Sequence, residues 1–377
     1  MQVSSDARPD CAWLAMAKRI SELDGLRGTA ALLVVVAHYF GETPHGWVGL
    51  MWGWQAVDVF FVLSGYLIGS IILDSSGEAG FAPSFYLRRA ARIVPAYGMT
   101  IAAGFAIAWL FRSKPWCDHL LPLAAYLTFT QNFAIASGLD GGLWLLPTWT
   151  LAVEEQFYLL MPVLIMLVPR HWLGGMLIAL FLAAGLFRWA YYDIDKFAAL
   201  TLLPGRMDML FVGVIAALVQ RRLDLKRHLF ALRLTPLIAM VILLAVVVID
   251  RTRVFQLIAP SALGVGAASF ILAMVHGAPE GARFRSTVLQ AAGRISYGLY
   301  LFHQPVSGLV HGLLFNAVPD VNGLPQILAS FLAFAIALGL AQISWLLVEA
   351  PIIDWVKRRR DNARASVELA TPAPEVT

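Results

Sequence analysis

The sequence predicts an all-α polytopic membrane protein of about ten transmembrane helices, with both termini in the cytoplasm. Three observations predict this fold class. Of the 377 residues, 59% are hydrophobic and only 14% are charged, so the chain is far more apolar than a soluble protein of this length. Long apolar blocks recur along nearly the whole chain and leave no stretch for a soluble domain of ordinary size. The basic residues gather in the short loops between those blocks.

Ten apolar segments have lengths that suit membrane crossings. The expected spans are residues 26–42, 55–73, 93–112, 150–168, 172–190, 207–220, 234–249, 256–275, 296–315 and 326–349. A further apolar segment, residues 120–136, is a candidate for an eleventh crossing. If it does not cross, the later basic clusters lie on the same side as the earlier ones and the N-terminus, as the positive-inside rule requires. Ten crossings are therefore favoured, with residues 113–148 forming an outside loop or re-entrant piece.

We expect three parts along the chain: a cytoplasmic leader at residues 1–20, an integral membrane domain at 21–356, and a basic, then disordered cytoplasmic tail at 357–377. The leader has no cleavage site after a short apolar core, so it does not look like a signal peptide. The cysteines, Cys11 and Cys117, would lie on opposite sides of the membrane, which argues against a disulfide or a cysteine-based metal site. The net charge of +4 falls in the loops and gives no reason to expect nucleic-acid binding.

The first expected span contains three ionisable residues, Asp24, Arg27 and His38. A helix of about 1.5 Å rise per residue places Arg27 and His38 on one face roughly 16 Å apart, with Asp24 one turn earlier. Ionisable groups at membrane depth cost at least about 2.5 kcal/mol each, so they normally face a cavity or a partner. The stripe therefore indicates a functional cavity. The structural alternative is an arginine that extends to the headgroups and a histidine that is hydrogen-bonded between helices.

Five sequence blocks carry a resemblance to a known family. They are LDGLRGTAALLVVVAHY, VDVFFVLSGYLI, FYLRRAARIVPAY, TWTLAVEEQFYLLMPV and ISYGLYLFHQPV, and they run in this order from residue 23 to residue 306. Together they resemble the membrane acyltransferase-3 family, in particular the O-antigen, exopolysaccharide and Nod-factor O-acetylases. One block alone would be weak evidence, whereas five in the family's order are specific.

The resemblance implies an enzyme that moves acyl groups, often acetyl from acetyl-CoA, onto hydroxyls of glycans or glycosides. The family's essential histidine and arginine in the first helix correspond to His38 and Arg27. Some members carry a C-terminal hydrolase-like domain, and this sequence resembles the stand-alone version without it. The implied location is the inner (plasma) membrane, with acyl-CoA as co-substrate and with no metal or permanently bound cofactor.

O-acylation needs a base that takes the proton of the acceptor hydroxyl, and a neutral imidazole inside the membrane suits that task. We expect His38 to be the general base and Arg27 to support the donor or the developing negative charge. Glu154 and Glu155 begin the fourth expected span near the depth of His38, and one of them would orient the imidazole. Adjacent helical positions point about 100° apart, so only one glutamate should face the cavity. The structural alternative is a charge that stabilises the helix N-terminus.

Other residues are candidates for the cavity wall and for the donor's phosphates. His303 lies in mid-span with Ser296 and Tyr300 on its helical face, where it either lines the same cavity or is hydrogen-bonded between helices. Three arginines are candidates for CoA phosphate or for a topology anchor at the headgroups: Arg88, Arg89 and Arg92. The remaining cavity candidates are Asp24, Asp58 and Tyr158, while Arg206 and Asp208 form either a structural ion pair or acceptor contacts.

The predicted function is transfer of an acyl group, most simply acetyl, from acyl-CoA to a hydroxyl of a cell-envelope or exported glycan. Acylation of a small glycoside such as a macrolide is the alternative within this class. A proton-coupled transporter or flippase is the alternative of another class, with a path lined by Arg27, His38, Glu154 and His303. A sensor or scaffold without catalysis is a third. The sequence leaves open the acceptor, the acyl length, the oligomeric state, and whether an acyl-histidine forms.

Overall fold

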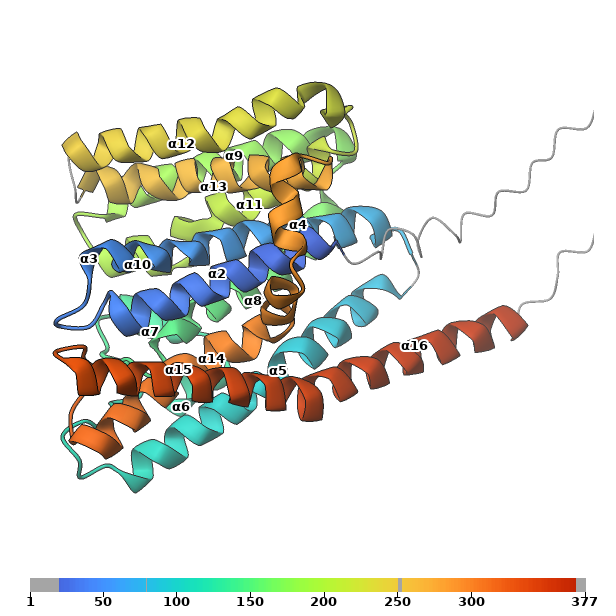
Figure 1. The fold of residues 1–377 in the computed structure, drawn as a ribbon. Helices are drawn as coiled ribbons and strands as arrows, with labels where there is room; N and C mark the ends of the chain where they lie inside the picture. Colours follow the sequence, from blue (N-terminus) through green and yellow to red (C-terminus); the bar gives the residue numbers. More distant parts are fainter. Residues whose placement is uncertain (1–19, 79, 250–252, 371–377) are drawn as a thin grey trace, which may run out of the picture.

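The computed structural model describes residues 20–78, 80–249 and 253–370, and every regular element within these ranges is helical. The long helices are α2 (Ser21–Phe40), α4 (Ala56–Ser75), α5 (Phe81–Leu110), α8 (Trp149–Leu167), α9 (Arg170–Tyr191), α11 (Leu203–Val219), α12 (Leu229–Ile249), α13 (Arg253–Val275), α14 (Thr287–Phe315), α15 (Leu324–Ser344) and α16 (Ala350–Ala370). Figure 1 shows most of them running side by side, with α16 extending away from the others.

Short helices connect the long ones. They are α3 (Val48–Met51), α6 (Leu123–Leu127), α7 (Gln131–Ala136) and α10 (Lys196–Thr201), the 3₁₀ turns Trp52–Gln55, Leu146–Thr148, Leu225–His228 and Pro279–Arg285, and the π-helical turn Trp345–Glu349. Residues 120–136 thus form helices of five and six residues, which are too short to cross a membrane. This agrees with the prediction that the segment is not an eleventh crossing.

Nine stretches of the described chain are helical, long and apolar enough to cross a membrane. They coincide with every expected span except residues 296–315. That segment lies in α14, which has 29 residues and is long enough to cross, but whose serine, glutamine, glycine and histidine residues lower its hydropathy. The all-helical membrane fold is therefore confirmed, whereas the cytoplasmic location of the termini remains a prediction.

Two helix boundaries differ from the expected ones. Helix α5 begins at Phe81 and not near residue 93, because Phe81 and Phe85 are buried on one face and continue the helix. The arginines at 88, 89 and 92 consequently lie within a helix and not in a loop. Helix α16 continues to Ala370, where disorder was expected after Arg360. Residues 1–19, which include most of the expected leader and Cys11, and residues 371–377 lie outside the described residues.

The helices that build the site are held by close backbone contacts. In the described part of the chain, α14 with α2 and α11 with α4 form the two most extensive helix pairs. A Cβ atom at Gly28 of α2 would collide with the backbone of α14, and one at Gly293 of α14 would collide with the Asp24 carbonyl. Glycine at these positions lets two transmembrane helices approach at backbone distance. This contact fixes the register of α2 against α14.

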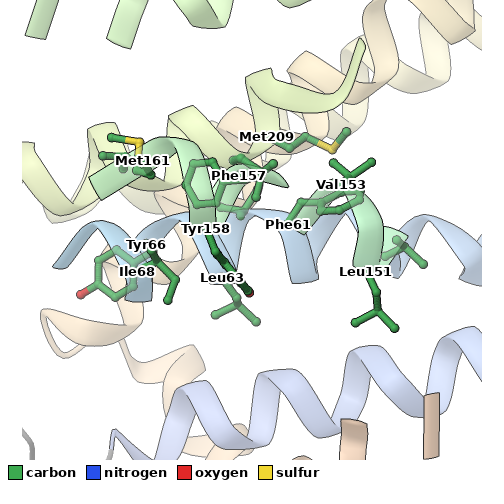
Figure 2. Close-up of a cluster of buried hydrophobic side chains, with 14 of the residues drawn as sticks. Phe61, Leu63, Tyr66, Ile68, Leu151, Val153, Phe157, Tyr158, Met161 and Met209 are labelled. Carbon is green, nitrogen blue, oxygen red and sulfur yellow. The ribbon is translucent and has the colours of Figure 1, made fainter. Parts of the chain in front are cut away.

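Helix α8 packs on the α4 and α11 pair through large apolar side chains. Figure 2 shows Phe61 of α4, Phe157 of α8 and Met209 of α11 lying together. The ring centroid of Phe157 is 5.8 Å from that of Phe211, in an edge-on arrangement that aromatic pairs favour. The packing places Glu154, one turn before Phe157 and Tyr158 on α8, beside Ser64 of α4.

Candidate active site

A cavity of about 780 Å³, counting the part open to the surroundings, lies among α2, α4, α5, α8 and α14. Its polar lining consists of Arg27, Ser64, Arg89, Arg92, Thr150, Glu154, Tyr158, Ser296, Tyr297 and Tyr300. The structure thus brings together residues that are up to 273 positions apart in the sequence, from Arg27 to Tyr300. We call this space the arginine cavity, after Arg27, Arg89 and Arg92.

The three arginines converge on the cavity from two helices. Arg27 comes from α2, and Arg89 and Arg92, three positions apart, come from one face of α5. Within the described ranges, none of their guanidinium groups forms an ion pair or a hydrogen bond, and Nε of Arg89 is buried without a partner. Arg92 lies 5.9 Å from the ring centroid of Trp345. Guanidinium groups at a cavity wall whose N–H donors have no protein acceptor are suited to an anionic ligand, phosphate above all.

Arg88, the third arginine of the basic cluster, does not line the cavity. It lies one position from Arg89 and therefore points about 100° away around α5. Of the three arginines predicted to bind phosphate, the structure brings Arg89 and Arg92 to the cavity wall.

Glu154 is the carboxylate of the cavity. It accepts hydrogen bonds from the hydroxyls of Ser64, at 2.8 Å, and Tyr158, at 3.1 Å. Glu155 does not line the cavity, and its buried Oε1 atom lacks a hydrogen-bond partner in the described part of the chain. One glutamate of the pair therefore faces the cavity, as the 100° spacing predicted. No sequence feature singled out Ser64, whose hydroxyl donates a hydrogen bond to the carboxylate of Glu154.

His38 meets a second histidine. Its Nδ1 atom lies 2.9 Å from Nε2 of His303 on α14, and the two rings stack with centroids 5.0 Å apart. Nδ1 of His303 lies 2.7 Å from the carbonyl oxygen of Tyr300, and the hydroxyl of Tyr39 donates to the carbonyl of His303 at 2.5 Å. His303 is fully buried. The two histidines that the sequence selected by depth alone therefore form a hydrogen-bonded pair.

The carboxylate nearest His38 is Glu42, not Glu154 or Glu155 as expected. Oε2 of Glu42 lies 3.5 Å from Nε2 of His38. Glu154 is the sixth residue of α8 and thus more than a turn inside the helix, whereas His38 lies two residues before the end of α2. Burial raises the pKa of Glu42 to about 7. The spacing of four between His38 and Glu42 was the sequence signal that could have identified this residue.

Tyr300 connects the cavity with the histidine pair. It lines the cavity, and its ring centroid is 5.8 Å from that of His303. Its hydroxyl donates to the Pro147 carbonyl at 2.9 Å and lies 2.8 Å from the Thr150 hydroxyl. His38 itself does not line the cavity. The polar stripe predicted on α2 thus has Arg27 in the cavity and His38 beyond its Tyr300 end.

The other predicted residues lie outside the cavity lining. Asp58 is buried and forms an ion pair with Arg206 at 3.2 Å. Asp208 forms a separate ion pair, with Arg188 at 2.7 Å, so Arg206 and Asp208 are not partners. Asp24 lies in the first turn of α2, within electrostatic range of Arg27. Among the described residues, no group of three or more histidine, cysteine, aspartate or glutamate side chains is arranged to hold a metal ion.

Comparison with known proteins bears on the site as a whole. The model of a family described as an acyltransferase domain matches residues 20–346. A Staphylococcus aureus (strain COL) protein, named as a candidate O-acetyltransferase, is 26% identical over 88% of this chain and 57% of its own length. The O-acetyltransferase OatA of S. aureus (strain NCTC 8325 / PS 47) is 26% identical over 88% of this chain and 56% of its own length. The chain therefore spans somewhat more than half the length of these relatives. No solved structure matches.

Proposed function

We propose that this chain, which belongs to the acyltransferase-3 family of membrane proteins, transfers an acetyl group from acetyl-CoA to a hydroxyl group of a cell-envelope or exported glycan. The observation that carries the proposal is the arginine cavity, which offers three guanidinium groups that form no ion pair or hydrogen bond within the described residues and which ends beside a histidine pair. The family membership supports acyl transfer, and the relatives named as O-acetyltransferases support acetyl as the group and oxygen as its acceptor.

The arginine cavity suits the donor. Acyl-CoA carries several phosphate charges on a long, uncharged thioester arm, so it needs cations at one end of its site and a passage at the other. Arg89 and Arg92 would bind phosphate oxygens, and Arg27 would bind a further phosphate or the thioester oxygen as it gains negative charge. Phe60, Thr150 and Tyr300 line the remainder of the cavity toward His303.

His38 suits the role of general base in direct transfer. The acceptor hydroxyl gives its proton to the imidazole as its oxygen attacks the thioester carbonyl carbon. The carbon–sulfur bond then breaks, and the CoA thiolate leaves with the proton that the imidazolium returns. The products are the O-acetyl ester, free CoA and neutral His38, so each turnover restores the enzyme.

The end of α2 near His38 suits a carbohydrate acceptor. The exposed indole of Trp47 stacks on Phe40 with ring centroids 5.9 Å apart, two residues beyond His38. Trp52 is also exposed and lies in the following 3₁₀ turn. Flat aromatic faces of this kind stack on sugar rings. A glycan that reaches His38 from this end would meet a donor that enters from the opposite, cytoplasmic end.

The first experiment measures thioester consumption by the purified protein in lipid nanodiscs. Acetyl-CoA with an acceptor glycan should yield free CoA thiol in the wild type, and His38→Ala should abolish this release because the variant lacks the proposed general base. Expression of the variant should stay near normal, since an interhelical hydrogen bond in a membrane contributes only about 0.6–1.7 kcal/mol. A transporter has no reason to release CoA. If the wild-type protein releases no free CoA, the proposal is refuted.

The acceptor class and the orientation are tested in cells. Deletion of the gene, followed by mass spectrometry of envelope polysaccharides and secreted glycosides, should show loss of one acetyl mass from a glycan. An unchanged glycan with an altered small glycoside would overturn the glycan assignment. Reporter fusions after Gly77, Arg227 and Arg285, which lie between long helices, should report the cytoplasm, and a fusion at Asp140 should report the outside, because the positive-inside rule places the basic segments inward. A cytoplasmic signal at Asp140 would contradict this orientation.

A further inference from the structure

We propose that His303 is a positioning residue that holds His38 in the tautomer whose free lone pair is on Nε2, and that Glu42 is the charge partner of the imidazolium formed there. This inference rests on the proposed function for its catalytic part. The assignment of the tautomer rests on the hydrogen bonds alone, so the two can be tested separately.

The tautomers follow from one carbonyl group. A backbone carbonyl oxygen can only accept, so the 2.7 Å contact between Nδ1 of His303 and the Tyr300 carbonyl requires that Nδ1 carry a proton. In neutral His303 the other nitrogen, Nε2, must then be an acceptor. Nδ1 of His38 lies 2.9 Å from it and must therefore be the donor. The proton-accepting atom of His38 is consequently Nε2.

His303 is held rigidly enough for this role. Its side chain is fully buried, its ring stacks on that of His38, and its own carbonyl accepts a hydrogen bond from Tyr39, the residue after His38. The close approach of α2 and α14 at Gly28 and Gly293 places the two rings at this distance. A partner fixed in this way suppresses the other tautomer and ring orientation of His38, which would direct the basic nitrogen away from the reacting hydroxyl.

Glu42 completes the arrangement on the opposite side of the His38 ring. Its Oε2 atom is 3.5 Å from Nε2, the atom that receives the proton. A carboxylate at this place stabilises the imidazolium without competing for the Nδ1 proton, which stays with the bond to His303. The acceptor hydroxyl would therefore approach Nε2 beside Glu42, at the end of α2.

Three variants of His303 test its role because their side chains differ in which contact they keep. The amide of Gln reaches the position of Nε2 and can accept from His38, whereas the amide of Asn reaches only the position of Nδ1. Leu fills a similar volume and accepts nothing. We expect His303→Gln to retain much of the wild-type kcat, and His303→Asn and His303→Leu to lose at least about 100-fold in kcat with KM for acetyl-CoA unchanged. Equal kcat values for the Asn and Gln variants, or wild-type activity in the Leu variant, would overturn the role of His303.

Nitrogen-15 NMR of the histidine-labelled protein in lipid tests the tautomer without any turnover. The signals of His38 among the eight histidines are those that disappear in His38→Gln. In the wild type, we expect Nδ1 of His38 to be protonated and Nε2 to be unprotonated. In His303→Leu, we expect a mixture of the two tautomers of His38. A wild-type His38 protonated on Nε2 refutes the inference. If the wild type releases no CoA but shows the expected tautomer, the proposed function fails while the positioning of His38 by His303 stands.

Discussion

Arginines lie inside this helical bundle in two different settings. At Arg188, the guanidinium is fully buried and bonds to Asp208 at 2.7 Å, to the Ser261 hydroxyl at 2.8 Å and to the Gly205 carbonyl at 2.6 Å. Arg206 likewise bonds to Asp58 and lies against the rings of Trp54 and Trp149. In the arginine cavity, by contrast, none of the three guanidinium groups has a hydrogen-bonded or ion-paired partner within the part of the chain that the structure describes, although Arg92 lies against the ring of Trp345.

The difference separates structural charges from charges that are kept for a ligand. A charged group inside a membrane protein must recover its lost hydration from some partner. Arg188 and Arg206 obtain it from fixed protein groups, so they join helices and leave nothing for a substrate. The guanidinium groups of Arg27, Arg89 and Arg92 face open space instead. The residue type is the same in both settings, and the partners distinguish them.

The largest expected effect is the loss of stability when the buried ion pair of Arg188 and Asp208 is broken. Asp208→Asn leaves Arg188 buried without its counter-charge, which should lower the free energy of unfolding by about 3–5 kcal/mol. Denaturant unfolding in micelles measures this. Asp193→Asn is the matched control, because its pair with Arg253 is exposed and should contribute at most about 1 kcal/mol. Equal stabilities of the two variants would show that Arg188 and Asp208 do not form a structural centre.

A smaller effect is expected from a substitution in the arginine cavity, where the affinity for the donor should change and the free energy of unfolding should not. Arg89→Gln removes one charge-assisted contact to phosphate, typically worth about 1.5–3 kcal/mol, so KM for acetyl-CoA should rise roughly 10- to 150-fold with unfolding unchanged. Steady-state kinetics and the same unfolding assay measure the two quantities. Arg88→Gln is the neighbouring control, and a comparable rise in KM there would mean that the cavity does not hold the donor.

The smallest expected effect concerns Glu42 and is seen in pH dependence. The pKa of Glu42 is raised to about 7 by burial, so the carboxylate that stabilises the imidazolium forms only as pH rises through this value. The pH profile of kcat should therefore rise near pH 7 in the wild type, and this rise should be missing in Glu42→Gln. The titratable groups that face Glu42 are His38, four positions before it, and Tyr300 on α14. A rise near pH 7 that persists in the variant would mean that another group causes it.

The raised pKa of Glu42 also predicts how the free energy of unfolding changes with pH. Because the pKa of Glu42 is higher in the folded protein than in the unfolded chain, its contribution is present below pH about 4.5 and is lost as pH rises through about 7. The side chain is about one-third exposed, so this change should be modest. Glu42→Gln should be less sensitive to pH over that range.

Hydropathy and charge were sufficient to predict the helices and several residues of the candidate site. Arg27, His38 and His303 stood out because ionisable residues are rare at membrane depth, and that signal is local to each helix. Partners were not predictable, because pairing depends on which helix faces which. The contacts of Arg188 with Asp208 and of His38 with His303 join helices whose mutual packing no single span encodes. Ser64 looked like any small residue of an apolar helix until Glu154 was placed beside it.

The histidine pair also has a consequence for synthesis of the protein. Its two members are 265 positions apart, on the first and on one of the last long helices that the structure describes. A ribosome therefore delivers α2, with His38, to the membrane long before α14 emerges with its partner. Until then, α2 lacks its most extensive helix partner, and Nδ1 of His38 lacks its contact with His303. The proposed positioning of His38 by His303 therefore predicts that acyl transfer begins only when insertion of α14 brings His303 to His38.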